Sequence, residues 1–401
     1  MIKTILTSIV PIEFFENEHI EFFINICCKE SILLPSTYSE EMKNLINDLN
    51  IKNVDLFKIQ PINNESELLC FRMGTTLILS ISVFDEYDNY YDLVNNSLIR
   101  KNRIVKRILS ANADNEMLNK FLRKINNCKI PFTKIHYCFS FISVYDSSFN
   151  DSNKIHIRIL AEPSLIDMDD MIGTNIESLK YTKRTVINKK YLDNIDDVDI
   201  SHQSITYITW ASISSVTKGE YCVFIKNHTT LILLEIIIQK IWNKCFFYNS
   251  LIDDELQKRV KNKHDSSKYI SIMDLSIGAY SALVESKSCI SATYSSRISK
   301  IFDEIIKTSQ VTDKVEELEK KLDFLNSFVN RSIHHDNRNV QKVSEILLFL
   351  IALTQVALLL FPLPLINNTI LGTVIMFCLV ISGIFIILGI INHRDSLTIL
   401  H

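Results

Sequence analysis

A helix-forming stretch near residue 100 carries a run of basic side chains. The predicted helix from Leu98 to Leu109 contains three arginines and two lysines. Such a helix usually presents a charged face to solvent. Arginine also binds phosphate through paired hydrogen bonds, so the same face would suit the phosphate groups of a ligand. The sequence leaves both interpretations open, and the candidate ligand-binding residues are Arg100, Arg103 and Arg107.

A second set of candidate residues lies in an apolar segment near the C-terminus. Steps of three and four residues connect six side chains, which therefore share one face of a helix. Polar groups in a membrane helix usually face protein or water. One interpretation is packing against a second membrane helix, and the other is a pore with an apolar constriction that excludes water. We favour the pore, whose lining would be Asn337, Gln341, Ser344, Leu348, Ile351 and Gln355.

The chain has no recognisable catalytic motif. It lacks the G-x-S-x-G, H-E-x-x-H, P-loop and G-x-G-x-x-G patterns, and its seven glycines leave little from which to build a phosphate-binding loop. Nine scattered cysteines include no C-x-x-C pair, which favours reduced, buried thiols over a zinc site or disulfides. His334 and His335 are adjacent on a predicted helix and point in different directions. We therefore expect a protein that is not an enzyme, with no cofactor and no metal site.

The pore candidates would be positioned by a long helix. Apolar residues from Val311 to Val329 alternate at steps of four and three, the spacing that lets a helix pack along a partner helix. That partner would be the stalk of another subunit or the helices between Thr229 and Lys307. No proline or glycine interrupts the chain between Val311 and Phe361, so this stalk helix is predicted to continue into the apolar segment.

Two apolar runs predict a hairpin of membrane helices. The first run is about 343–361, the second about 369–391, and each is long enough to cross a bilayer. Pro362 and Pro364 separate them. By the positive-inside rule, the flanking basic residues place both termini in the cytoplasm and the turn outside, which predicts a multi-pass protein of the inner (plasma) membrane. Those basic residues are Arg331, Arg338, Lys342 and Arg394.

The part of the chain before the stalk is predicted to be an α+β domain. Helices are expected at 14–30, at 39–49 and across 88–127, with a break near residue 113. Strands are expected at 69–73, 77–84, 132–144 and 155–160. A final hairpin is expected to join strand 205–216 to strand 221–225, and the apolar stretch 231–248 is predicted as a buried helix because Glu235, Lys240 and Lys244 interrupt it. The domains would be 1–228 (α/β, cytosolic), 229–342 (helical stalk region) and 343–401 (membrane helices and a short cytosolic tail).

This order of parts resembles the CorA superfamily of divalent-cation channels. The segment NRNVQKVSEILLFLIALTQVALLLFPLP, Asn337 to Pro364, is similar to the passage of that family from stalk to membrane. The resemblance implies an oligomer, a pentamer in the family, with the first membrane helix around the pore. The family's Gly-Met-Asn signature is missing, because residues 362–368 read PLPLINN at that place.

A divergent branch of the superfamily also lacks the signature and is associated with type III CRISPR systems. Its members look like membrane effectors opened by a nucleotide messenger, an S-adenosylmethionine–AMP conjugate. The resemblance thus implies a messenger-gated channel of antiviral defence, with the lipid bilayer and a homo-oligomer as partners. The alternatives are a divalent-cation transporter without the usual signature and a membrane-anchored scaffold or sensor without a pore. A net charge of −3 and the absence of a basic stripe interleaved with aromatic residues argue against binding of a nucleic-acid polymer.

Overall fold

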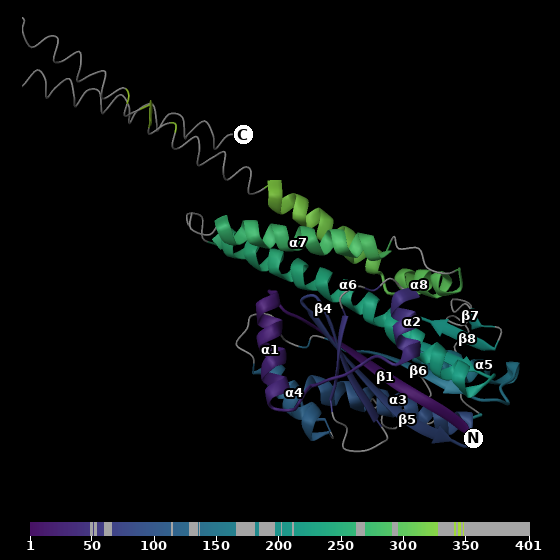
Figure 1. Ribbon diagram of the computed structural model, residues 1–401. Coiled ribbons are helices and arrows are strands. Elements are labelled where there is room, and N and C mark those ends of the chain that lie inside the picture. Colours follow the sequence, from purple (N-terminus) through teal and green to yellow (C-terminus); the bar gives the residue numbers. More distant parts are fainter. Residues whose placement is uncertain are drawn as a thin grey trace, which may run out of the picture. The chain divides into compact units, whose positions relative to one another are not determined.

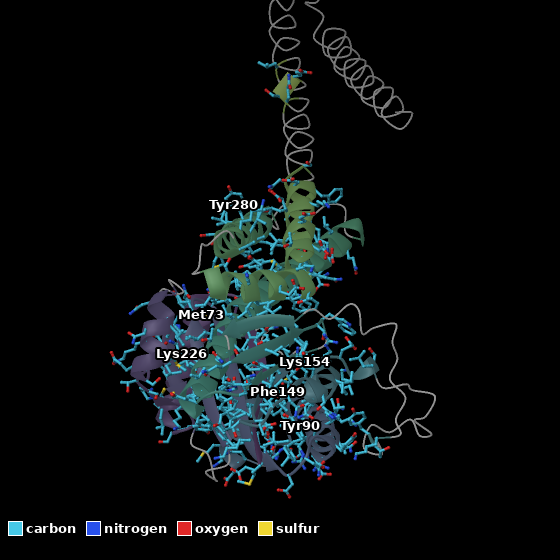
Figure 2. The ribbon with its side chains drawn as sticks, turned by 90° about the vertical axis from the view of Figure 1, so that its right-hand side faces the viewer. Met73, Tyr90, Phe149, Lys154, Lys226 and Tyr280 are labelled. Carbon is cyan, nitrogen blue, oxygen red and sulfur yellow. The ribbon has the colours of Figure 1, made fainter. Side chains whose placement is uncertain are left out.

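The computed structural model contains an N-terminal α/β domain with long helices (Figure 1). It describes residues 1–48, 51, 54–59, 66–113, 115–127, 135, 137–165, 181–183, 197–201, 203–210, 212–261, 269–290, 296–327, 341, 344–345 and 348. The chain forms two compact units, Met1–Asp323 and Phe324–His401. The second predicted membrane helix and most of the first predicted one lie outside the described residues, and the predicted domain boundaries remain predictions.

A nine-stranded mixed sheet organises the first unit, in the order β2-β3-β4-β5-β1-β6-β9-β8-β7. The long strand β1 lies at its centre, antiparallel to β5 on one side and to β6 on the other. Only β6 and β9 are parallel among these described strands. The strands are β1 (Ile2–Glu13), β2 (Leu34–Pro35), β3 (Val54–Lys58), β4 (Ser66–Met73), β5 (Thr76–Tyr87), β6 (Phe139–Tyr145), β7 (Asp197–Ser201), β8 (Ser204–Ile208) and β9 (Ile213–Thr217).

Helices cover both faces of this sheet (Figure 1). One face packs on α1, α3, α4 and α5, where apolar side chains of alternate positions on β1 and β5 are buried. The other face packs on α6, which is followed by α7 and α8. These helices are α1 (Asn17–Lys29), α2 (Glu40–Asp48), α3 (Tyr90–Leu109), α4 (Glu116–Asn126), α5 (Lys154–Ala161), α6 (Tyr221–Lys261), α7 (Tyr269–Ile290) and α8 (Ser296–Thr308).

Local sequence signals explain several element boundaries. The Asn89 side chain accepts a hydrogen bond from the Asp92 amide and so caps the N-terminus of α3. Asn115 caps α4 in the same way by accepting from the Leu118 amide at 2.9 Å. The turn between β4 and β5 uses Gly74 with φ of 67°, a conformation that glycine adopts without steric cost. The predicted helices 14–30, 39–49 and 88–127, with its break, and the paired strands 69–73 and 77–84 are confirmed.

The prediction of a strand at 155–160 is wrong, because these residues belong to helix α5. Alternation of Ile155, Ile157 and Ile159 with polar residues suggested one buried face. In the fold, α5 packs against α3 and β9, so five of its eight residues are buried, His156 and Leu160 included. A short helix enclosed on most sides has no polar face from which its helical period could be recognised.

The predicted hairpin of strands 205–216 and 221–225 is also wrong. The strand ends at Ile208, and the hairpin joins β8 to β9 through a turn in which the Thr209 amide donates to the Ser212 carbonyl at 3.0 Å. The next connection, residues 218–220, leads into α6. Residues 221–225 are helical because Phe224 and the following turns of α6 are buried against the sheet.

The N-terminal part of the stalk, residues 311–327, is helical. Its seam residues Val311, Val315, Leu318 and Leu322 are buried within the first unit. Ion pairs join this helix to its own chain: Lys321 contacts Asp253 of α6 at 2.7 Å, and Glu319 contacts Lys287 of α7 at 2.6 Å. The sequence left open whether this seam packs against another subunit or against helices of the same chain. For residues 311–322 the partners are helices of the same chain.

Candidate functional site

A cavity of about 560 Å³ lies between α3, the strands β4 and β5, and the start of α4. Helix α3 crosses the sheet face here, and α4 begins near the far end of the same opening. The arrangement leaves one flank of α3 facing a hollow and the other facing α5. The lining residues therefore come from elements that are separated by up to 52 positions in the chain, from Ser66 to Leu118.

The three arginines predicted as ligand-binding residues line this cavity together. Arg100, Arg103 and Arg107 follow one another at steps of three and four and so share a flank of α3. Arg100 forms an ion pair with Asp85 at the end of β5, and it also hydrogen-bonds the Tyr87 hydroxyl. Arg103 is exposed, and among the described residues no side chain pairs with it. The cavity thus presents guanidinium groups that can accept an anion.

The remaining basic residues of α3 do not line the cavity. Lys106 is exposed on another part of the helix. Lys101 is largely covered, and its burial lowers the pKa of the ammonium to about 8, although Cys138 and Glu162 favour its charged form. Of the five basic residues of this helix, the three arginines therefore line the cavity and the two lysines do not.

The opposite wall of the cavity is apolar. Leu68 of β4 and Ile81 and Val83 of β5 are buried core residues that form the floor, and Ile108 and Leu118 close it from the helices. Asn96 and Asn115 add amide groups at the rim. An apolar floor with a few polar groups and a charged wall is the usual composition of a small-molecule site. It suits a ligand with a flat or apolar part and an anionic part.

The structure leaves the predicted pore lining largely undescribed. Gln341, Ser344 and Leu348 are helical and exposed, and the Gln341 side-chain amide donates to Glu345 at 3.3 Å. The other members, Asn337, Ile351 and Gln355, lie outside the described residues. Nothing in the described part of the chain brings these six residues together or separates them.

Sequence reasoning missed a polar network along α6. His228 lies between Ser143 of β6, at 2.8 Å, and Thr7 of β1, at 3.3 Å. Farther along, Lys240 and Lys244 each contact Glu285 of α7 at 2.5 Å. For Lys240 and Lys244 the available signal was the presence of charged residues in the apolar stretch 231–248, which indicated a buried helix but not the partners of these residues; His228 lies outside that stretch. This network connects the sheet, α6 and α7.

One helix in the described part of the chain, Tyr221–Gln257, is long and apolar enough to cross a membrane by length and composition. However, 67% of its most apolar window is buried inside the protein, and it lies between the sheet and α7 (Figure 1). This agrees with the prediction of a buried helix at 231–248. The helix is weak support for membrane association, because the core helix of a soluble protein has the same properties.

The described residues contain no group of three or more His, Cys, Asp or Glu side chains that could hold a metal ion. The arginines and the apolar floor of the cavity can bind an anionic ligand. Among models of known protein families and among curated proteins, none matches this chain.

Proposed function

We propose that the protein is a CorA-like, oligomeric membrane channel opened by an anionic nucleotide that binds in the cavity beneath α3. Its role would be that of an effector in type III CRISPR antiviral defence, with an S-adenosylmethionine–AMP conjugate as the candidate messenger. The observation that carries the proposal is the cavity itself, in which Arg100, Arg103 and Arg107 face an apolar floor. Phosphate would contact the arginines and a nucleobase would cover the floor.

The C-terminal segment supplies the second half of this proposal. Helices at about 343–361 and 369–391 would form a hairpin in the inner membrane, with both termini in the cytoplasm. The first helices of several subunits would surround a pore lined by Asn337, Gln341, Ser344, Leu348, Ile351 and Gln355. The stalk would carry movement from the body to this pore, because no proline or glycine interrupts it from Val311 to Phe361. No catalytic step is required.

The experiment uses the full chain in proteoliposomes loaded with a fluorescent ion indicator. ATP and the S-adenosylmethionine–AMP conjugate are titrated, and binding is measured on the detergent-solubilised protein by calorimetry. Replacing Arg103 or Arg107 by Gln should weaken nucleotide binding about tenfold or more, because each loses a charge-assisted contact in the cavity. Lys106→Gln is the matched control, since it removes the same charge from the same helix outside the cavity, and it should bind like the wild type.

The outcomes separate the alternatives. Nucleotide-dependent ion flux that is lost in Arg103→Gln supports the gated channel. Nucleotide binding without flux in any lipid would favour the scaffold or sensor, and flux of divalent cations without nucleotide would favour a transporter. If neither nucleotide binds, or if Lys106→Gln weakens binding as much as Arg103→Gln does, the cavity is not the ligand site.

A further inference from the structure

Asp85 is the one acidic side chain among the described residues that line the arginine cavity. It follows the buried part of β5, and its carboxylate pairs with Arg100, which lies 15 positions later on α3. An anion that reaches Arg100 must therefore meet a carboxylate already in contact with the same guanidinium. We propose that Asp85 is a built-in competitor for the ligand anion, which sets the affinity of the cavity and selects for ligands with enough negative charge to replace it.

This inference rests on the cavity being the ligand site of the proposed function. The geometry supports exchange rather than a fixed structural bond. The side chains of Asp85 and Arg100 are 19% and 36% exposed, so neither is locked in the core. The backbone of Asp85 is held in the sheet opposite Thr4, whose hydroxyl donates to the Asp85 carbonyl at 3.3 Å. Only the carboxylate needs to move, and the strand keeps its pairing.

Space for that movement lies next to the ion pair. Asp85 and Arg100 also line a second cavity of about 380 Å³, and Arg103 is not among the residues that line it. Lys3 contributes to the wall of this second cavity, where it contacts Glu86 at 3.6 Å and lies over the Tyr221 ring. A carboxylate leaving Arg100 would remain at this open space, and its side chain is already 19% exposed, so the exchange would not bury an unpaired charge.

The exchange explains how one cavity could distinguish ligands by charge. A neutral nucleoside can use the apolar floor formed by Leu68, Ile81 and Val83, and it has no need of Arg100. A phosphorylated ligand gains a contact to the exposed Arg103 directly, and it gains the contact to Arg100 only by replacing Asp85. Removal of the Asp85 charge should therefore strengthen binding of the anion and leave binding of the neutral nucleoside unchanged.

The test compares ATP with adenosine on the full chain in detergent, by calorimetry at two salt concentrations. Asp85→Asn keeps the shape of the side chain and removes its charge, and we expect ATP affinity to rise about tenfold, with adenosine affinity unchanged. Asp85→Glu keeps the charge and should remain close to the wild type. Asp88→Asn is the matched control, because it makes the same substitution three residues later at an exposed position that lines neither cavity, and it should not change the ratio of ATP to adenosine affinity.

Thermal melting of each variant shows whether it is folded, so a loss of binding caused by unfolding can be distinguished from a loss of ligand contacts. If Asp85→Asn is folded and binds ATP as weakly as the wild type or more weakly, Asp85 does not compete with the ligand. Should Arg103→Gln weaken ATP binding in the same series, the proposed site stands and only the competitor role is overturned. If ATP binds neither the wild type nor Asp85→Asn, and Arg103→Gln makes no difference, both proposals fail.

Discussion

Glu235 offers a test of the fold that does not depend on the ligand. Its side chain is fully buried on α6, where Oε2 accepts a hydrogen bond from the Gln239 amide at 3.1 Å. Within the described residues Oε1 has no hydrogen-bond partner. Burial penalises the charged form and raises the pKa of this carboxyl to about 8, although the Gln239 contact opposes the shift. Glu235 is therefore protonated in the folded protein at neutral pH.

The sign of the effect on stability follows from the two pKa values. In the unfolded chain Glu235 ionises near its ordinary value of 4.5, whereas in the folded protein it keeps its proton up to about pH 8. Between these values the folded state binds more protons, so its stability falls as pH rises and then levels off above pH 8. A shift of this size corresponds to roughly 5 kcal/mol of lost stability across that window.

Replacing Glu235 by Gln keeps the size and polarity of the side chain and removes the ionisable group. The variant should melt like the wild type at pH 5, and at pH 8 it should melt about 5 °C higher, given the usual ratio of stability change to melting shift in a protein of this size. Asp254→Asn is the control, because Asp254 is exposed on the same helix. Melting curves of the full chain in detergent at half-unit steps from pH 5 to 9 measure the difference. If the gap between Glu235→Gln and the wild type does not grow with pH, Glu235 is not held protonated in the core.

Two further predictions concern the connection of α6 to α7 and the pore. Burial raises the pKa of Glu285, but Lys244 and Lys240 outweigh it and the net pKa is lowered, so the ion pairs stabilise the fold at neutral pH and are lost as pH falls below about 4.5. Glu285→Gln should therefore destabilise the protein by about 3 kcal/mol in denaturant titrations at pH 7, because two largely buried lysines lose their partner. The loss should shrink as the pH is lowered through the depressed pKa of Glu285, and a loss that does not change with pH would contradict this. In the proposed pore, Ile351→Asn should wet the predicted constriction and produce a ligand-independent leak in planar bilayers, whereas Leu350→Asn, off the predicted face, should not. A variant protein inserted at normal abundance without a leak would show that Ile351 is not the gate.

Local patterns in the sequence were sufficient for elements with an alternating pattern or a capping residue. Leu79, Ile81 and Val83 alternate with serines and were correctly predicted as a strand, although Ser80 and Ser82 are buried too, because helices cover both faces of the sheet. Asn89 and Asn115 mark the starts of α3 and α4 through their own side chains. These signals depend only on residues within a few positions of one another, so they can be read without knowledge of the rest of the fold.

Tertiary structure decided the elements that are enclosed on several sides. Helix α5 and the first turns of α6 were predicted as strands, because a short buried segment lacks the polar face that would show its period. Tertiary structure also decided which groups the polar residues of α6 contact. His228 is paired with Ser143, and Lys244 with Glu285, and these partners lie far away in the sequence.

The candidate site combines both kinds of information. The spacing of Arg100, Arg103 and Arg107 put three guanidinium groups on one flank of a helix, which is a property of the sequence alone. The cavity exists only because α3 crosses β5 and α4 at a distance that leaves a hollow above Val83. The same crossing brings Asp85 to Arg100. The spacing of the arginines in the sequence thus indicated which residues can bind an anion. The packing of α3 on the sheet determined that they face the apolar floor and that Arg100 meets Asp85.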